Sequence, residues 1–484
     1  MKHPTPAADR LSLRTVLALW VLGLVPRLIP LLFLLNAPIA LEDMFQYDML
    51  ARSLASGRGY RWYAAEDVEV LKPYLAQYLD LSALRAPPEG LVTAHRAPGY
   101  PFFLAGLYLL IPSEHRFAAA RLVQAVLAAF MSPLVAMVAL QMKMGRRAAM
   151  MAAAGVALYP ILLFYPVGLA SENLFIPLVL LSFWLLLRAA GSGRLTPFTL
   201  AGLVLGFSTL TRSIFFPATV LASVWLYRLQ QARNRGALLT LAVTLTICIP
   251  WAVRNTLTLK RLTFVESSLG YNLFIGYHPE GNGGFVADVA IKPLTILNDA
   301  ERERFCTRTA LQYIAADPVE AGRRVLRRVA YFMGVEDREF IWFYTNDFIG
   351  FIPQPWLGLI YSLLVVPWVS TVAFAVLGLS LSPERSSAGL AGALIAGYAL
   401  PHFFIIAEPR FHLALVPLLM PFAAWGWLRR REVVRLARQY DRKTLLALLF
   451  IVICAALWIW GIAHRWDLLM AIFGPEGNRL YLSY

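Results

Sequence analysis

Residues 12–35 read SLRTVLALWVLGLVPRLIPLLFLL, and this stretch decides the fold class. The run is mostly apolar and about 24 residues long, which is enough for a helix to cross the hydrocarbon core of a bilayer. Similar runs recur to the end of the chain, so the sequence predicts an all-α polytopic membrane protein. The basic N-terminus, MKHPTPAADR, is followed by no A-x-A cleavage signal, so we expect the first run to stay as a signal-anchor span.

The composition supports this class. The chain has 484 residues, of which 59% are hydrophobic and only 15% charged, and a soluble domain seldom carries so few charges. In a membrane protein the net charge of +15 belongs mainly to cytoplasmic loops, so we expect no nucleic-acid partner. Cys248 and Cys454 lie in apolar runs and Cys306 in a polar loop, which leaves no disulfide framework and no zinc spacing.

The Lys and Arg residues orient about eleven predicted spans. The spans are 12–35, 117–141, 148–167, 172–188, 197–211, 213–227, 237–253, 354–380, 388–406, 411–428 and 445–463. The apolar run 98–112 has only about 15 residues, so we predict an interfacial or re-entrant helix there. With the basic clusters inside, the N-terminus is inside, the C-terminus is outside, and the long polar segments 37–116 and 254–352 share the outer face.

This pattern divides the chain into three parts. Residues 1–253 form an N-terminal transmembrane module that contains the first outer loop, residues 254–352 form a partly helical extracytoplasmic loop region, and residues 353–484 form the C-terminal transmembrane helices. The chain has no internal repeat or hydropathy symmetry of the kind that marks many transporters.

The stretch LEDMFQYDMLARSLASGRGY (41–60) places acids and aromatics where the first span has just ended. Asp43, with a glutamine three residues on, has the spacing of a capping box, which predicts a helix over 44–56. Asp43 is equally a carboxylate at the outer membrane surface, fixed by a helix start and able to accept a proton. Both roles can hold together, whereas Glu42 and Asp48 are expected to be solvated or paired locally.

Three more charged residues stand out in the N-terminal half. Arg96, in HRAPGYP, is either a snorkelling side chain before a proline-started helix or a cation at a helix N-terminus, where phosphates bind. Glu172, in SENLFIPL, is either a helix cap or an acid of an outer site. Arg212 interrupts about thirty apolar residues, and ionisable groups at membrane depth usually face a partner or a water-filled cavity.

The remaining candidates follow later spans. Arg254 and Asn255 come after CIPWAV, and interfacial snorkelling is the alternative role for Arg254. Arg410 lies in IIAEPRFHLALVP with Glu408 and His412 beside it, and a simple Glu408–Arg410 surface pair is the alternative there.

The charged candidates converge on one face of the membrane. Four arginines from four distant segments map to the outer interface, together with the acids Asp43 and Glu172. A cavity in the outer leaflet, built for an anionic lipid phosphate, explains this set better than snorkelling does.

The motifs also form an ordered series. They are EDMFQYDMLARSLASGRGY, HRAPGYPFFLAGLY, SENLFIPLVLL, GLVLGFSTLTRS, PWAVRNTLTL with GYNLFIGYHPEGNGG, and AEPRFHLALVPLL. The series covers residues 10 to about 430 and resembles the GT-C superfamily of glycosyltransferases that use polyprenyl-phosphate sugars. The protein O-mannosyltransferases and the lipid A aminoarabinose transferases are the members that it resembles best.

The resemblance implies roles for individual residues. Asp43 corresponds to the essential acid of the family's first outer loop, and Tyr47 to its aromatic position. Arg96 and Arg212 correspond to basic residues that look toward the lipid phosphate, and Glu172 to an acid of the second outer loop.

The chain departs from the aminoarabinose transferases at two places. His95–Arg96 stands where those enzymes tend to have an acid–lysine pair, and Gln46 stands where they commonly have an arginine. These departures leave a divalent metal and an aminoarabinose-type acceptor as open questions.

The resemblance implies a membrane glycosyltransferase. It would move a sugar from a polyprenyl-phosphate donor to a hydroxyl or phosphate of an acceptor glycan, lipid or protein, with inversion. The implied location is the bacterial inner membrane, among its lipids, with the site on the periplasmic face. Arg254, Asn255, Arg410 and His412 join Tyr47, Arg96 and Arg212 as expected substrate-binding residues, with Asp43 and Glu172 as catalytic acids. The alternatives are an O-antigen ligase or polymerase that uses diphosphate-linked glycans, and a lipid or solute transporter.

Overall fold

The long apolar runs of the sequence fold into helices. The computed structural model describes residues 11–76, 87–192, 194–229, 234–338, 340–341 and 352–474, and nearly all regular elements within them are helical. The exception is a short ladder in which β1 (Arg61–Trp62) pairs antiparallel with β2 (Leu91–Val92). The predicted all-α polytopic class is therefore confirmed.

Eight helices of the described residues are long and apolar enough to cross a membrane, or nine if a bent pair counts as one span. They are α1 (Leu13–Leu34), α5 (Arg116–Ala129) with α6 (Met131–Gln141), α9 (Glu172–Ser192), α12 (Asn234–Leu259), α18 (Gln354–Ser380), α19 (Arg385–Phe404), η7 (Pro409–Leu415) with α20 (Val416–Leu428), and α22 (Arg442–His464). The prediction of about eleven spans is too high by this measure. Helices α10 (Leu195–Thr211) and α11 (Phe216–Leu229) form where spans were expected, but 17 and 14 residues are short for a bilayer.

The bent pair consists of α7 (Gly145–Ala157) and a second segment, formed by α8 (Pro160–Phe164) and the turn after it. The axes of the two segments meet at 56°. Pro160 cannot continue the hydrogen bonds of α7, so the last carbonyls of α7 need other partners. The guanidinium of Arg27, on α1, is fully buried and donates to the carbonyls of Val156 and Ala157 at 3.1 and 3.3 Å. This buried arginine therefore stabilises the break in the span.

The two polar segments fold into short helices. In the first, α2 (Asp43–Ala55) matches the predicted helix, and α4 (Gly99–Tyr108) is, as expected for its run, too short to cross. In the second, residues 299–333 divide into two consecutive helices, α15 (Asp299–Ala316) and α16 (Pro318–Met333). The division falls at Asp317, which caps α16 through the backbone N–H of Glu320.

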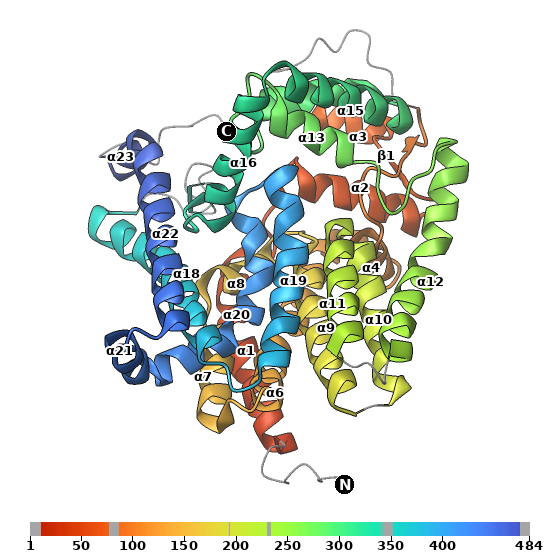
Figure 1. Ribbon diagram of the computed structural model, residues 1–484. Helices are drawn as coiled ribbons and strands as arrows, with labels where there is room; N and C mark the ends of the chain where they lie inside the picture. The colour runs from red at the N-terminus through yellow and green to blue at the C-terminus, as the bar shows by residue number, and fades with distance from the viewer. Residues whose placement is uncertain are drawn as a thin grey trace.

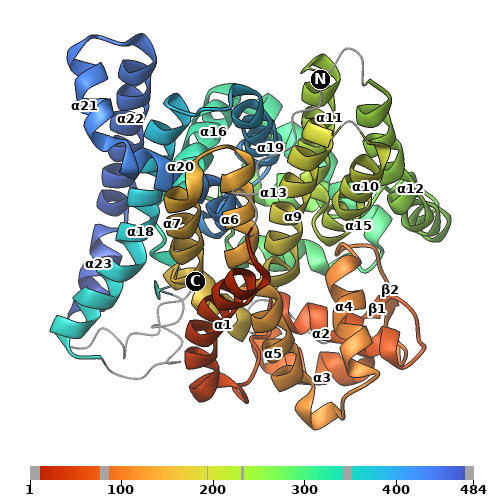
Figure 2. The same ribbon diagram turned by 90° about the horizontal axis from the view of Figure 1, so that it is seen from below.

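The polar segments come together at one end of the helix bundle. Figure 1 shows α2, α3 (Ala65–Leu75), α13 (Leu269–Tyr277) and α15 at the end opposite the start of α1. Seen from below in Figure 2, α18 and α22 lie on one side of the bundle and α10, α11 and α12 on the other. Segments that are more than 200 residues apart in the sequence thus lie together above the spans, for example at the contact between Thr93 and Asp299.

Candidate functional site

A cavity of about 760 Å³ lies where this end layer meets the bundle. Its wall includes six of the nine candidate residues from the sequence, namely Asp43, Tyr47, Arg96, Glu172, Arg212 and Arg410. Much of the remaining wall is apolar, for instance Leu34, Ile161, Phe164, Ile360 and Leu364. The cavity therefore has a charged wall and an apolar wall, as an amphipathic ligand requires.

Asp43 is the first residue of α2, and two arginines hold its carboxylate. Oδ1 is paired with Nη2 of Arg96, and Oδ2 lies 3.2 Å from Nη2 of Arg410. The predicted capping box is wrong: Glu42 is the N-cap residue, with no side-chain capping bond. The reason is that Arg96 binds both side chains of the expected capping box. It pairs with Asp43, and its Nε donates to Oε1 of Gln46 at 2.8 Å.

The two guanidiniums decide the charge of Asp43. Burial by itself would raise the pKa of this carboxyl, but Arg96 and then Arg410 hold the pKa well below its usual range. The carboxylate is therefore ionised, and 35% of its side chain is exposed, so it is accessible from the cavity that it lines.

A second cluster gathers around Arg212. Its Nη1 lies 2.5 Å from Oε1 of Glu172, the first residue of α9, and 3.3 Å from Oγ of Ser171. The hydroxyl of Tyr47, on α2, donates to the same Ser171 oxygen at 3.2 Å. Arg212 has extended backbone at the end of α10, so the helix stops there and the guanidinium lies 5.3 Å from the ring of Phe411.

Arg410 joins the two sides of the site. Its Nε donates to Oε2 of Glu408 at 2.9 Å while its Nη2 reaches Asp43. The expected Glu408–Arg410 pair exists, but Glu408 is buried rather than on the surface, and it also pairs with Arg338. Sequence reasoning missed Glu408 and Arg338 as site residues. For Arg338, in VEDREF, no local signal separates it from the other arginines of the second polar segment.

Three predicted substrate-binding residues lie outside the cavity wall. Arg254 donates to the carbonyls of Thr93 and Tyr60 at 2.6 and 3.3 Å, and Asn255 donates to the carbonyl of Val265 at 2.9 Å. These bonds tie the end of α12 to neighbouring loops, and of the three residues that accept them only Val265 belongs to the cavity wall. The position of both residues therefore supports a bracing role instead of contact with a substrate.

His412 lies in the protein interior instead of in the cavity wall. Its Nδ1 is 2.7 Å from the carbonyl oxygen of Phe332, and its Nε2 is 3.2 Å from Oε1 of Glu336. The ring stacks on Trp368 with 3.6 Å between centroids. This position packs η7 against the end of α16 and supports no direct role in substrate binding.

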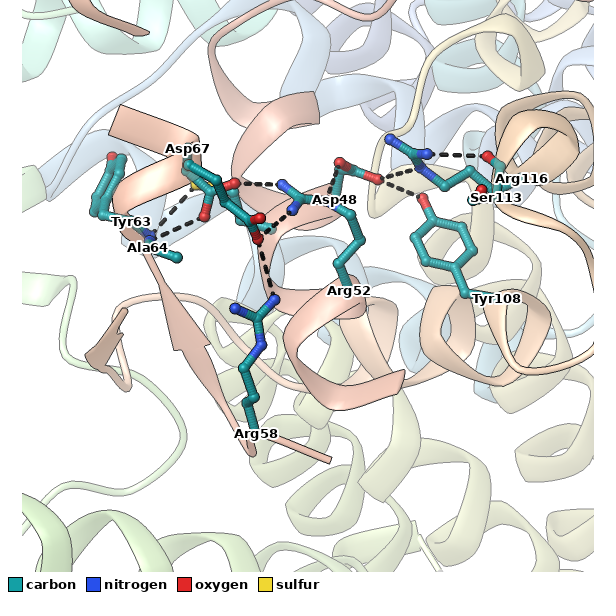
Figure 3. Close-up of polar contacts among 11 residues, drawn as sticks. Asp48, Arg52, Arg58, Tyr63, Ala64, Asp67, Tyr108, Ser113 and Arg116 are labelled. Carbon is teal, nitrogen blue, oxygen red and sulfur yellow. Dashed lines mark hydrogen bonds and ion pairs between the residues drawn. The ribbon is translucent and has the colours of Figure 1, made fainter. Parts of the chain in front are cut away.

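A buried network fixes α2 (Figure 3). The carboxylate of Asp48 accepts from Nε of Arg52 at 2.7 Å, Nε of Arg116 at 3.0 Å and the hydroxyl of Tyr108 at 3.0 Å. Arg52 continues to Asp67 on α3 at 2.5 Å. Asp48 was expected to be solvated or paired locally: it is buried, the local pair with Arg52 is present, and Tyr108 and Arg116 join it from distant parts of the chain. Because three other helices, α3, α4 and α5, hold α2 in this way, its other face is fixed with Asp43 and Tyr47 at the cavity.

The acids of the site are poorly suited to a metal ion. Each of the three acids already forms an ion pair with an arginine; they are Asp43, Glu172 and Glu408. Within the part of the chain that the structure describes, no three His, Cys, Asp or Glu side chains come together as a metal site would require.

Comparisons with known proteins cover part of this arrangement. Residues 95–253, about a third of the chain, match the family of dolichyl-phosphate-mannose-protein mannosyltransferases. The matched range holds Arg96, Glu172 and Arg212, whereas Asp43 and Arg410 lie outside it. No curated protein sequence matches the chain.

Two solved structures align with most of the chain at low sequence identity. The oligosaccharyltransferase of Archaeoglobus fulgidus in its apo form aligns with a TM-score of 0.47 and 12% identity, over 97% of this chain and 60% of that chain. ArnT from Cupriavidus metallidurans bound to undecaprenyl phosphate aligns with a TM-score of 0.35 and 14% identity, over 88% of this chain and 79% of that chain. The chain thus spans only 60% of the length of the oligosaccharyltransferase.

Proposed function

We propose that this chain, which matches the dolichyl-phosphate-mannose-protein mannosyltransferase family over residues 95–253, is a membrane glycosyltransferase. It takes a sugar from a polyprenyl-phosphate donor and passes it to an acceptor hydroxyl or phosphate. The observation that carries the proposal is one cavity in which Asp43 and three arginines from distant segments meet beside an apolar wall. The acceptor is a glycan, lipid or protein, and the site faces the outside of a bacterial inner membrane.

The two walls of the cavity suit the two parts of such a donor. The phosphodiester carries one negative charge and several acceptor oxygens, which Arg96, Arg212 and Arg410 can bind with paired N–H donors. The polyprenyl chain is a hydrocarbon and lies along the apolar wall. Because both walls belong to one cavity, the sugar is held next to Asp43.

The arginines also lower the barrier of transfer. When the bond between the sugar and the phosphate oxygen breaks, the leaving lipid phosphate gains a second negative charge. Guanidiniums that already touch its oxygens stabilise this charge, so the leaving group needs no general acid. Asp43 removes the proton of the acceptor hydroxyl as it attacks the anomeric carbon, and a single displacement inverts that carbon.

Binding of the donor activates Asp43 in this mechanism. Without a donor, Arg96 and Arg410 lower the pKa of Asp43, and a carboxylate in that state is a weak base. A phosphodiester competes for the same two guanidiniums. As they turn to the phosphate, the carboxylate loses stabilising partners and its basicity rises. The base thus becomes effective only when the sugar is in place.

The test uses purified full-length protein with a polyprenyl-phosphate sugar. Asp43→Asn should abolish transfer while undecaprenyl phosphate still raises the thermal midpoint. Arg212→Ala should raise the donor KM by about tenfold or more, since a charge-assisted contact to phosphate is lost. The exposed Arg146→Ala, far from the cavity, is the control. Near-normal transfer by Asp43→Asn would refute the assignment of the base.

A further inference from the structure

A second recess lies on the other side of the α13–α15 layer. It is an open groove of about 540 Å³ between Arg261, two residues after the end of α12, and one face of α15. The lining residues are Arg261, Arg304, Thr307, Arg308, Leu311, Gln312 and Ala315, and none of them belongs to the wall of the catalytic cavity. The groove is therefore a separate candidate site, with three arginines and two neutral polar side chains.

The arginines of the groove form no close ion pairs among the described residues, and the nearest acid that Arg261 influences is Glu303, whose carboxylate is bound to Gly270. None of Arg261, Arg304 and Arg308 forms an ion pair with any other residue that the structure describes. Arg304 only donates through Nε to the carbonyl of Ala300, one turn back, and Nη1 of Arg261 is buried without a hydrogen-bond partner among the described residues. Arg304 and Arg308 stand one helical turn apart, where like charges repel. An anion in the groove would satisfy all three side chains.

The groove also lies at the level where a membrane ends. Arg261 follows α12, a helix long and apolar enough to cross a membrane, by only two residues. Between them Lys260 has a φ of 50°, a left-handed conformation that costs a side-chain-bearing residue about 1 kcal/mol, and it turns the chain sharply. Leu262, next to Arg261 in the chain, is 87% exposed, and Leu311, which lines the groove, is 57% exposed. Exposed leucines beside unpaired arginines are suited to hydrocarbon and headgroups together.

We propose that this groove binds the phosphate of an anionic lipid headgroup beside the catalytic cavity. Arg304 and Arg308 contact the phosphate from α15, and Arg261 contacts it from the end of α12. Thr307 and Gln312 supply further hydrogen bonds, and the leucines border the acyl chains. Guanidiniums are the side chains best matched to phosphate oxygens, since each offers several N–H groups in a fixed fork.

The groove is connected to the site through one hydrogen-bonded layer. The carboxylate of Glu303, on α15, accepts from the backbone N–H of Gly270 at 2.8 Å and so holds the start of α13. Leu269 and Asn272 of α13 line the catalytic cavity. A lipid bound to α15 therefore steadies the layer that covers the cavity, and we expect transfer to be faster in membranes that contain anionic lipids.

Lipid binding is tested by native mass spectrometry of the full-length protein, supplied with phosphatidylglycerol and no sugar donor. The variant R304Q/R308Q should retain about tenfold less phosphatidylglycerol than the natural protein. The control R323Q/R327Q removes two exposed arginines with the same spacing on α16 and should change nothing. R261Q provides an independent variant on another segment if the double variant unfolds. Since no donor is present, the result is independent of the proposed transfer reaction.

Two outcomes overturn the proposal. One is equal retention of phosphatidylglycerol by R304Q/R308Q, R261Q and the natural protein. The second outcome comes from an experiment in which inorganic phosphate replaces the lipid and the thermal midpoint of the protein is measured. Stabilisation by inorganic phosphate that R304Q/R308Q abolishes, without retention of phosphatidylglycerol, would mean that the groove takes a free phosphate and no lipid.

Discussion

At the scale of single residues, the ionisation of Asp43 links donor binding to catalysis in the proposed mechanism. Its carboxylate holds Arg96 and Arg410 in the structure, and these are groups to which we assign the donor phosphate. The three negative charges of Asp43, Glu172 and Glu408 keep the arginines in place until a donor arrives. An arginine site without these acids would bind phosphate but would leave the acceptor proton with no base.

The pH dependence of the rate tests this link. Arg96 and Arg410 lower the pKa of Asp43, so the free enzyme keeps an ionised base on the acid side of neutrality. We expect kcat/KM, which reports the free enzyme, to show no acid limb from Asp43 between about pH 7 and 5. The acid limb of kcat, which reports the donor complex, should lie at higher pH than that of kcat/KM. Coincident limbs would contradict the competition between donor and carboxylate.

At the scale of elements, α2 depends on the buried carboxylate of Asp48. Asp48→Asn keeps the shape but removes the charge that neutralises Arg52 and Arg116. Breaking a buried ion pair costs several kcal/mol, and because both arginines are about a quarter exposed we expect a loss of about 2 kcal/mol. Thermal unfolding measures it. The exposed pair Glu69–Lys72 is the control, since Glu69→Gln should cost less than about 0.5 kcal/mol. Equal midpoints for the two variants would contradict the role of Asp48.

A second structural unit joins the end of α16 to η7. Two segments meet through alternate residues: Glu336 contacts His412, and Arg338 contacts Glu408. Arg410 lies between these contacts and reaches Asp43. The buried pair thus fixes the backbone from which a catalytic-site arginine extends, which explains a histidine in this position without direct contact to substrate.

The protonation of Glu336, the acid that contacts His412, makes the free energy of unfolding depend on pH. Burial raises the pKa of Glu336 to about 8, although the hydroxyl of Tyr159, at 2.7 Å, acts to lower it. An acid whose folded pKa is raised binds more protons when folded, so stability falls as pH rises from the unfolded value toward about 8. The thermal midpoint should fall between about pH 5 and 8, and Glu336→Gln should flatten that fall. Glu384→Gln, which affects an ion pair with exposed Lys143, should leave it unchanged. An undiminished slope in Glu336→Gln would disprove the role of this proton.

At the scale of the whole molecule, the end layer and the basic helix α21 (Arg430–Arg438) lie toward opposite ends of the bundle (Figure 1). From the positive-inside rule we expect α21 in the cytoplasm and the cavity on the outer face. Cysteine labelling checks this orientation, because the natural cysteines are buried. In intact cells a membrane-impermeant maleimide should label Glu301→Cys on α15 and spare the exposed Tyr440→Cys after α21. The reverse pattern would place the cavity on the cytoplasmic face.

The elements differ in how well the sequence predicts them. The helices α1, α9 and α22 follow from hydrophobic length alone, because a long apolar run has to satisfy its own backbone in a membrane. The span count was less secure, since α10 and α11 are apolar but short. The capping box at Asp43 was the clearest local error, and it arose because a distant arginine outcompeted a local backbone bond.

By itself the sequence determined the polytopic helical class, the two polar segments and the small set of charged residues worth considering. Only the tertiary structure decided which of them share a cavity. Arg254 and Arg410 are both arginines near a span end, yet one braces loops and the other reaches Asp43 across 367 residues of chain. The physical reason is that an interfacial arginine takes whichever oxygen the folded chain brings within about 3 Å. That choice depends on long-range packing, which no local pattern of residues encodes.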